Sequence, residues 1–319
     1  MKIESITQVG EGRVILLQKE GIPTQIDLEE LSSSSLILAC DFYLSGAENG
    51  ISMPGGYKCG RVINVDHHAP TARMNQKISS GVLAGEYVRA VGLPASEADI
   101  FLNHADCDSI VSSAILRGLV DSSPELDRAV IAADHTGEEN LIADTLQPMD
   151  KFRNPRLSYR ALRLLIDGEP LEPEMQAELE SQRRDRQRAK ELVASGAFRE
   201  YGNGLYFGVI PVRFDSAFLP SLLPMATLIV AAVPRPGGRH EYKLRLGFAA
   251  PAGFTIHELN VGSFDENYGG RWNAGSDARA KVSEPFCSLS PEAYIAKLEE
   301  ALEAVLTLSQ PDSARSSSE

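Results

Sequence analysis

The chain has 319 residues, a formal net charge of −13, and ordinary fractions of apolar (43%) and charged (24%) residues. This length predicts about two domains, each with a core of its own. The negative charge argues against sequence-independent binding to long duplex nucleic acid, which requires a basic surface, but it permits a short anionic substrate whose charge a metal neutralises locally.

Membrane and secretory signals are missing from the sequence. No apolar run approaches the roughly 20 residues that span a bilayer, and residues 1–5 lack the basic-then-apolar layout of a secretory signal. The four cysteines are scattered without a Cys-x-x-Cys pair, which argues against a disulfide framework or a structural zinc site. We therefore expect a cytoplasmic protein without a membrane partner.

Residues 1–156 alternate between strand-like and helix-like patterns. A helical spacing over Ser80–Val91 is closed by Gly92 and Pro94. This alternation predicts an α/β fold with a doubly wound, mostly parallel sheet. The apolar runs that we predict as strands are Arg13–Leu17, Ser35–Asp41, Val62–Val65, Ile100–Asn103 and Ala129–His135.

Acidic and imidazole side chains follow four of these runs. Because ligands of open α/β sheets gather beyond the carboxyl ends of the strands, one location explains them all. Carboxylates mixed with imidazoles suit Mn²⁺, Fe²⁺ or Zn²⁺ better than Ca²⁺. Taken singly, an Asp-x-Asp pair is also typical of a helix cap, and a strand-end aspartate of a turn. The candidate residues are Asp41, Asp66, His67, His68, His104, Asp106, Asp108, Asp134 and His135.

The second half of the chain predicts a helical linker and a smaller α/β domain. Residues 157–200 are helical and highly charged, as expected of a solvated helix that joins two domains. Residues 201–309 follow with three predicted strands, a helix near 216–223 and a closing amphipathic helix over 291–308. The Ser-rich residues 310–319 are predicted to be disordered.

Three segments together resemble the DHH phosphoesterase superfamily. Asn64–His68 is similar to its Asp-His-His signature, and His104–Ser112 is similar to its His-x-Asp-x-Asp-x-x-x-Ser motif. Gly269–Ser276 resembles the Gly-Gly-His-x-x-Ala-Ala-Gly loop of the associated substrate domain.

The resemblance implies a catalytic domain over residues 1–156 that binds two divalent ions, typically Mn²⁺, with Mg²⁺, Co²⁺ or Zn²⁺ as substitutes, and a cleft shared with a substrate domain. Asp66 is implied to orient His67, and His68 to face the scissile phosphate, which a water activated by the ions attacks. The implied metal ligands are Asp41, His67, His104, Asp106, Asp108 and Asp134. The implied substrate-binding residues are Gly269, Gly270, Arg271, Asn273, Ala274 and Gly275.

Two departures from the family pattern leave alternatives open. The Asp-x-Asp motif follows Asp-His-His here, whereas it precedes it in familiar members, so Asp144 and Asp150 are alternatives to Asp134. Arg271 stands where the family has histidine, and an arginine can clamp a phosphate bidentately. Trp272 either stacks on a base or is a buried anchor, and Arg213 and Arg279 are further candidates for phosphate contacts.

We therefore expect a manganese-dependent hydrolase that cleaves phosphoesters of a small nucleotide or a short single-stranded oligonucleotide, the latter by an exonuclease-like action. Two alternatives stay open: an inorganic pyrophosphatase, and a regulatory module that binds nucleotide or metal without turnover. The sequence does not indicate an oligomeric state.

Overall fold

In a computed structural model the chain forms two compact units, unit 1 over residues 1–184 and unit 2 over residues 185–319. The structure describes residues 1–19, 21–68, 71–210, 214–279 and 286–308, so the tail predicted to be disordered lies outside the described residues. Helix α7 (Pro173–Ala194) runs from unit 1 into unit 2, and the division falls within the predicted helical linker. Among the described helices, none is long and apolar enough to cross a membrane.

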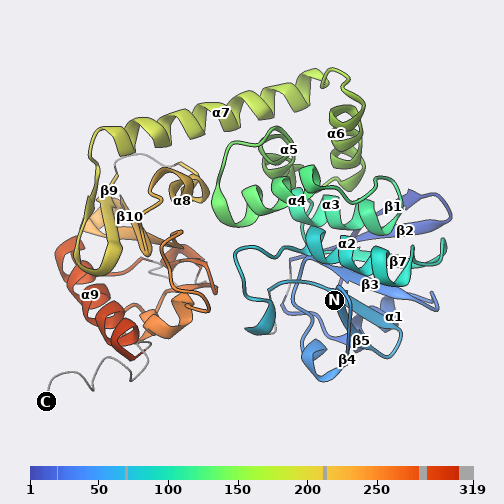
Figure 1. The fold of residues 1–319 in the computed structure, drawn as a ribbon, viewed down its shortest axis with the longest axis horizontal. Coiled ribbons are helices and arrows are strands. Elements are labelled where there is room, and N and C mark those ends of the chain that lie inside the picture. The colour runs from blue at the N-terminus through green and yellow to red at the C-terminus, as the bar shows by residue number, and fades with distance from the viewer. Residues whose placement is uncertain (20, 69–70, 211–213, 280–285, 309–319) are drawn as a thin grey trace, which may run out of the picture. The chain divides into compact units, whose positions relative to one another are not determined.

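Unit 1 is built on a seven-stranded sheet with the order β1-β2-β7-β3-β6-β5-β4 (Figure 1). Strands β2, β7, β3 and β6 are parallel, whereas β1, β5 and β4 pair antiparallel at the two edges. This confirms the predicted α/β class. The strands are β1 (Ile3–Val9), β2 (Gly12–Leu17), β3 (Ile37–Cys40), β4 (Ile51–Met53), β5 (Gly56–Cys59), β6 (Val62–Val65) and β7 (Asp99–Leu102).

Helices cover both faces of this sheet. Along β3, Leu38 and Cys40 pack into the core formed with α2 and α3, whereas Ile37 and Ala39 pack into a second core with Leu28 of α1. This two-residue alternation is expected of a strand buried on both faces. The helices of unit 1 are α1 (Gln25–Leu31), α2 (Ser80–Val91), α3 (Cys107–Leu116), α4 (Pro124–Ile131), α5 (Leu141–Leu146) and α6 (Pro155–Asp167).

The strand predicted over Ala129–His135 is wrong. Helix α4 occupies Pro124–Ile131, and a π-helical turn over Ala132–Thr136 follows it. Ser123 caps the helix by accepting a hydrogen bond from the Leu126 amide, and Pro124 holds its first position. The apolar run is the buried face of this helix, because a short apolar run does not distinguish a strand from a buried helix.

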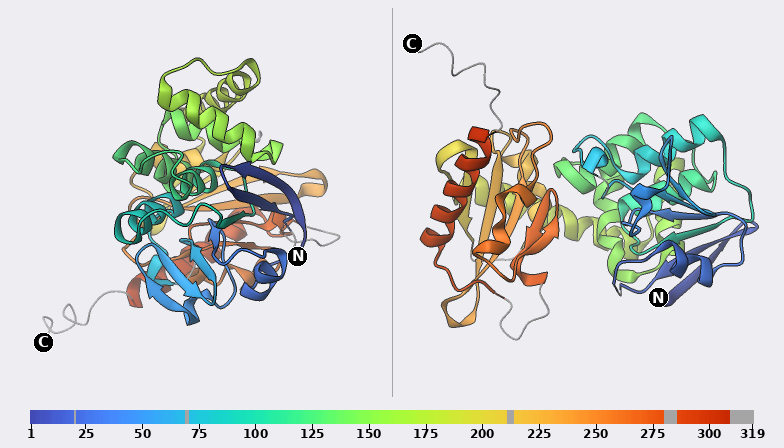
Figure 2. Two further views of the ribbon diagram at one scale, coloured as in Figure 1. Left: turned by 90° about the vertical axis from the view of Figure 1, so that its right-hand side faces the viewer. Right: turned by 90° about the horizontal axis from the view of Figure 1, so that it is seen from below.

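Unit 2 is a six-stranded mixed sheet with the order β12-β13-β11-β10-β9-β8. Helix α9 lies along one face of it (Figure 2), where Tyr294 stacks on Tyr242 of β11 with ring centroids 3.7 Å apart. Helix α8 and Ala189 of α7 pack against β10 in a second cluster. The elements are β8 (Phe198–Glu200), β9 (Leu205–Val209), α8 (Leu219–Leu222), β10 (Leu228–Pro234), β11 (His240–Leu246), β12 (Gly269–Arg271), β13 (Ala274–Ser276) and α9 (Pro291–Leu308).

Candidate metal centre

Three neighbouring parallel strands deliver the candidate side chains to one edge of the unit 1 sheet. Strand β3 lies between β6 and β7 and is followed by Asp41, whose amide donates to the Val65 carbonyl of β6 at 3.0 Å. Asp66, His67 and His68 follow β6, and the segment 103–106 follows β7 and leads into α3. The parallel pairing therefore brings together residues that are far apart in the sequence.

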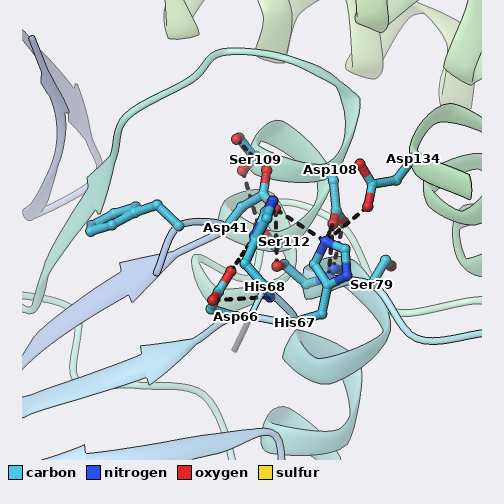
Figure 3. Close-up of polar contacts among 12 residues, drawn as sticks. Asp41, Asp66, His67, His68, Ser79, Asp108, Ser109, Ser112 and Asp134 are labelled. Carbon is cyan, nitrogen blue, oxygen red and sulfur yellow. Dashed lines mark hydrogen bonds and ion pairs between the residues drawn. The ribbon is translucent and has the colours of Figure 1, made fainter. Parts of the chain in front are cut away.

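His67 lies at the middle of the cluster (Figure 3). Its Nε2 atom is 2.8 Å from Asp134 Oδ2, 3.7 Å from Asp108 Oδ2 and 3.9 Å from Asp41 Oδ1. The side chain is fully buried, yet neither ring nitrogen meets the geometry of a hydrogen bond to any described residue. A buried imidazole in this condition is costly unless a ligand satisfies it.

The charges of the cluster favour a bound cation. Burial raises the pKa of Asp41 well above its usual range, and the carboxylates of Asp108, Asp106 and Asp134 raise it further. Burial also raises the pKa of Asp108 to about 6. Burial lowers the pKa of His67, but the Asp134 and Asp108 carboxylates outweigh it, and the net shift is upward. A divalent ion would relieve this repulsion and could bind the Nε2 atom of His67, which faces the three carboxylates.

Asp108 is held by the start of helix α2. Its two carboxylate oxygens accept hydrogen bonds from the backbone amides of Ser80 and Gly81, at 2.8 and 2.7 Å. A carboxylate is favoured there by the positive end of the helix dipole. A Cβ atom at position 81 would lie 3.2 Å from Asp108 Oδ1 and 2.9 Å from a Val130 methyl, so glycine permits this close approach.

Asp66 pairs with His68 and not, as the family resemblance implied, with His67. The Oδ1 atom of Asp66 lies 2.6 Å from His68 Nδ1, and Oδ2 accepts a hydrogen bond from the His68 amide at 3.1 Å. The turn after β6 directs the His67 ring into the buried cluster and leaves the His68 ring beside Asp66 (Figure 3). This contact fixes the orientation of His68 and places a proton on its Nδ1.

His104 and Asp106 lie at the margin of the cluster. They belong to neither of the two groups of ligand atoms within 4.8 Å of one another, which comprise Asp41, His67 and His68, and His67, Asp134 and His135. Asp106 caps helix α3 by accepting a hydrogen bond from the Ser109 amide at 3.2 Å. Burial lowers the pKa of His104, against the opposing influence of Asp106.

The structure distinguishes Asp134 from Asp144 and Asp150, the two alternatives for this metal ligand. Asp134 contacts His67, whereas the Asp150 carboxylate accepts a hydrogen bond from the Ala105 amide at 2.7 Å and from Lys19 at 3.0 Å. Asp144 is buried in α5 and contributes to neither group of ligand atoms. Of the three, the position of Asp134 suits a metal ligand best.

His135, one of the candidate residues, makes a contact that the sequence did not indicate. Its side chain is fully buried, and its Nε2 atom lies 2.8 Å from the Ile78 carbonyl. Ile78 immediately precedes Ser79, whose hydroxyl caps α2 by accepting from the Val82 amide. The hydrogen bond from His135 to Ile78 therefore links the π-helical turn, which contains Asp134, to the start of α2, whose backbone amides donate to the Asp108 carboxylate.

Metal-stripped protein is expected to lose stability as the pH rises from about 4 to about 6. Folded Asp108 keeps its proton up to a pKa of about 6, whereas the ordinary value is 3.8, so across this interval the folded state binds more protons than the unfolded chain. Urea unfolding in a chelator at several pH values measures the slope, and Asp108→Asn should remove this contribution. An identical pH dependence in the wild type and the variant would contradict the expectation.

The glycine segment of unit 2 forms a hairpin, with β12 and β13 paired through Gly270 and Gly275. A Cβ atom at position 275 would lie 2.1 Å from the Tyr268 hydroxyl, which explains the need for glycine there. Trp272 is 2% exposed, so it is a buried anchor and not a stacking platform. Arg213 and the side chain of Arg279 lie outside the described residues.

A polar hollow of about 280 Å³ lies beside this hairpin. Of the predicted substrate-binding residues, Ala274 and Gly275 line it, whereas Gly269, Gly270, Arg271 and Asn273 do not. Lys243 and Arg245 line it as well, and sequence reasoning missed them. Their two-residue spacing on one predicted strand was the available signal, because it places both on one face.

The fold and the cluster define unit 1 as an α/β protein with a buried carboxylate–imidazole site at the carboxyl edge of its sheet. No protein-family profile matches the chain, and no curated protein does. Among solved structures it is similar to a pGpG-specific phosphodiesterase, PggH, from Vibrio cholerae, with 14% identity over 71% of this chain and 89% of that one and a TM-score of 0.41. An uncharacterized protein from Helicobacter pylori G27 has 11% identity over 84% of this chain and 99% of that one and a TM-score of 0.23.

Proposed function

We propose that the protein is a metal-dependent phosphoesterase that hydrolyses small nucleotides or short oligonucleotides. The observation that carries this proposal is that the buried carboxylates of Asp41 and Asp108 and the partly buried carboxylate of Asp134 surround His67, whose ring nitrogens make no hydrogen bond to described residues. Such a set is unfavourable by itself and becomes favourable around divalent cations.

Asp41, His67, Asp108 and Asp134 would hold the metal, with His104 and Asp106 as further ligands at the margin. Carboxylates mixed with imidazoles suit Mn²⁺ and related ions. When bound, such ions polarise a phosphoryl oxygen and lower the pKa of water to near neutrality, so that water can act as the nucleophile. The buried residues contribute a fixed geometry and exclude bulk solvent.

His68 would act on the substrate, with Asp66 as its positioning partner. The Asp66 carboxylate lies against Nδ1 and accepts its proton in a hydrogen bond, so Nε2 would donate to the phosphate when the ring is an imidazolium, which carries a proton on both nitrogens. A donor at that point stabilises the negative charge that develops in the transition state.

Lys243 and Arg245 would bind a substrate phosphate in the hollow of unit 2. Arg245→Ala should raise KM about 10- to 100-fold with a much smaller change in kcat, because a hydrogen bond to a charged group contributes about 1.5–3 kcal/mol. Steady-state kinetics would measure this. Lys297→Ala, which removes an exposed positive charge from α9, is the matched control and should leave KM unchanged. Equal effects of both variants would contradict the assignment.

A product assay tests the proposed function directly. Metal-stripped protein would be incubated with Mn²⁺ and, separately, a 5′-phosphorylated dinucleotide, a longer single-stranded oligonucleotide and inorganic pyrophosphate. We expect mononucleotide release from the dinucleotide that depends on Mn²⁺. Turnover of pyrophosphate alone would favour the pyrophosphatase alternative. Binding of nucleotide without any product would favour a regulatory module.

A further inference from the structure

Two buried serines hold the Asp41 carboxylate from both sides. Ser80, at the start of α2, donates its hydroxyl to Oδ1 at 3.0 Å, and Ser109, in the first turn of α3, donates to Oδ2 at 2.7 Å. Both serines are 0% exposed. A metal-binding carboxylate is ionised and only accepts hydrogen bonds, so in that state both hydroxyl protons point at Asp41.

The backbone conformation of Asp41 is also unusual. Asp41 adopts a left-handed conformation with φ 59°, which is uncommon for a residue other than glycine. Its carboxylate is 4% exposed and faces the repulsion of Asp108, Asp106 and Asp134. Ser80 and Ser109 are the hydrogen-bond donors that hold the carboxylate in this orientation among the described residues.

The start of α2 also orients Asp108. The Ser80 and Gly81 amides fix its two oxygens, so Ser80 contacts Asp41 through its side chain and Asp108 through its backbone. Groups that hydrogen-bond to the ligands of a metal ion orient those ligands, and removing one commonly costs 10- to 100-fold in affinity.

We propose that Ser80 and Ser109 are positioning residues that set the metal affinity of the site by orienting Asp41. The inference rests on the proposed function only in that Asp41 binds a metal. It differs from the family resemblance, whose motif serine corresponds to Ser112. The Ser112 hydroxyl donates to the Ser109 carbonyl at 3.1 Å, which is a contact within helix α3.

Ser112 therefore provides a matched control, since it lies in the same helix and is equally buried. The variants Ser80→Ala, Ser109→Ala and Ser112→Ala, and the conservative Ser109→Thr, would be stripped of metal and titrated with Mn²⁺ by calorimetry. Thermal unfolding of each stripped protein reports whether it is folded and how stable it is.

We expect Ser80→Ala and Ser109→Ala each to weaken Mn²⁺ binding about 10- to 100-fold. Ser112→Ala should bind within about threefold of the wild type, and Ser109→Thr should recover most of the affinity because it keeps the hydroxyl. A merely structural role would lower the stability of the stripped protein without this selective loss of affinity. Wild-type affinity in both alanine variants, or an equal loss in Ser112→Ala, would overturn the inference.

His67→Ala separates this inference from the proposed function. If His67→Ala loses Mn²⁺ binding while the serine variants keep it, the positioning role is wrong and the metal site stands. If His67→Ala also binds Mn²⁺ like the wild type, the metal site itself is wrong, and the positioning role fails with it.

Discussion

His67→Ala should abolish both metal binding and hydrolysis, with a loss of activity on the order of 1,000-fold or more. The His67 Nε2 atom lies within 4 Å of carboxylate oxygens of Asp41, Asp108 and Asp134. Its removal takes away a nitrogen ligand and leaves the buried carboxylates to repel one another. Calorimetric titration with Mn²⁺ and a product-release assay measure the two losses.

His257→Ala is the control for this variant. His257 is exposed and lies in unit 2, outside both groups of candidate ligand atoms. It should leave Mn²⁺ affinity and turnover at the wild-type level. Retention of more than about a tenth of the activity by His67→Ala would be incompatible with its assignment as a metal ligand.

His68→Gln should lower kcat about 100- to 10,000-fold while leaving Mn²⁺ affinity nearly unchanged. This expectation follows from the proposed role of His68 as a donor to the substrate phosphate, with Asp66 positioning the ring through Nδ1. Single-turnover kinetics with saturating Mn²⁺ would isolate the chemical step, and a metal titration would be run on the same preparation.

Asp66→Asn complements the His68 variant. It should lower kcat by a smaller factor, because His68 remains but loses the partner that fixes its proton and orientation. If His68→Gln instead loses Mn²⁺ affinity as strongly as His67→Ala, His68 is a metal ligand and its assignment to the substrate is wrong.

The parallel part of the sheet was accessible from the sequence. Ser35–Asp41, Val62–Val65 and Ile100–Asn103 are short apolar runs that end in polar groups, and the structure places strands β3, β6 and β7 there. Parallel strands share a carboxyl edge, so the pattern also predicted that Asp41 and His67 lie together. Local patterns sufficed because each residue directly follows its own strand.

Other features depend on contacts that no local pattern contains. Asp134 reaches His67 from a π-helical turn, although the run before it was predicted as a strand. Ser80 and Ser109 contact Asp41 from positions far along the chain, 68 residues away in the case of Ser109. No sequence motif marks these two serines as partners of Asp41. Whether Asp66 pairs with His67 or with His68 depends on the conformation of the turn after β6, and the residue types alone do not determine that conformation.

Crystals grown with Mn²⁺ and measured near the manganese absorption edge would decide the assignment of the site. We predict an anomalous peak at coordination distance from the His67 imidazole and from the carboxylates of Asp41, Asp108 or Asp134. An anomalous map with no peak beside His67, from crystals in which these side chains are ordered, would contradict the proposal that this cluster binds divalent metal.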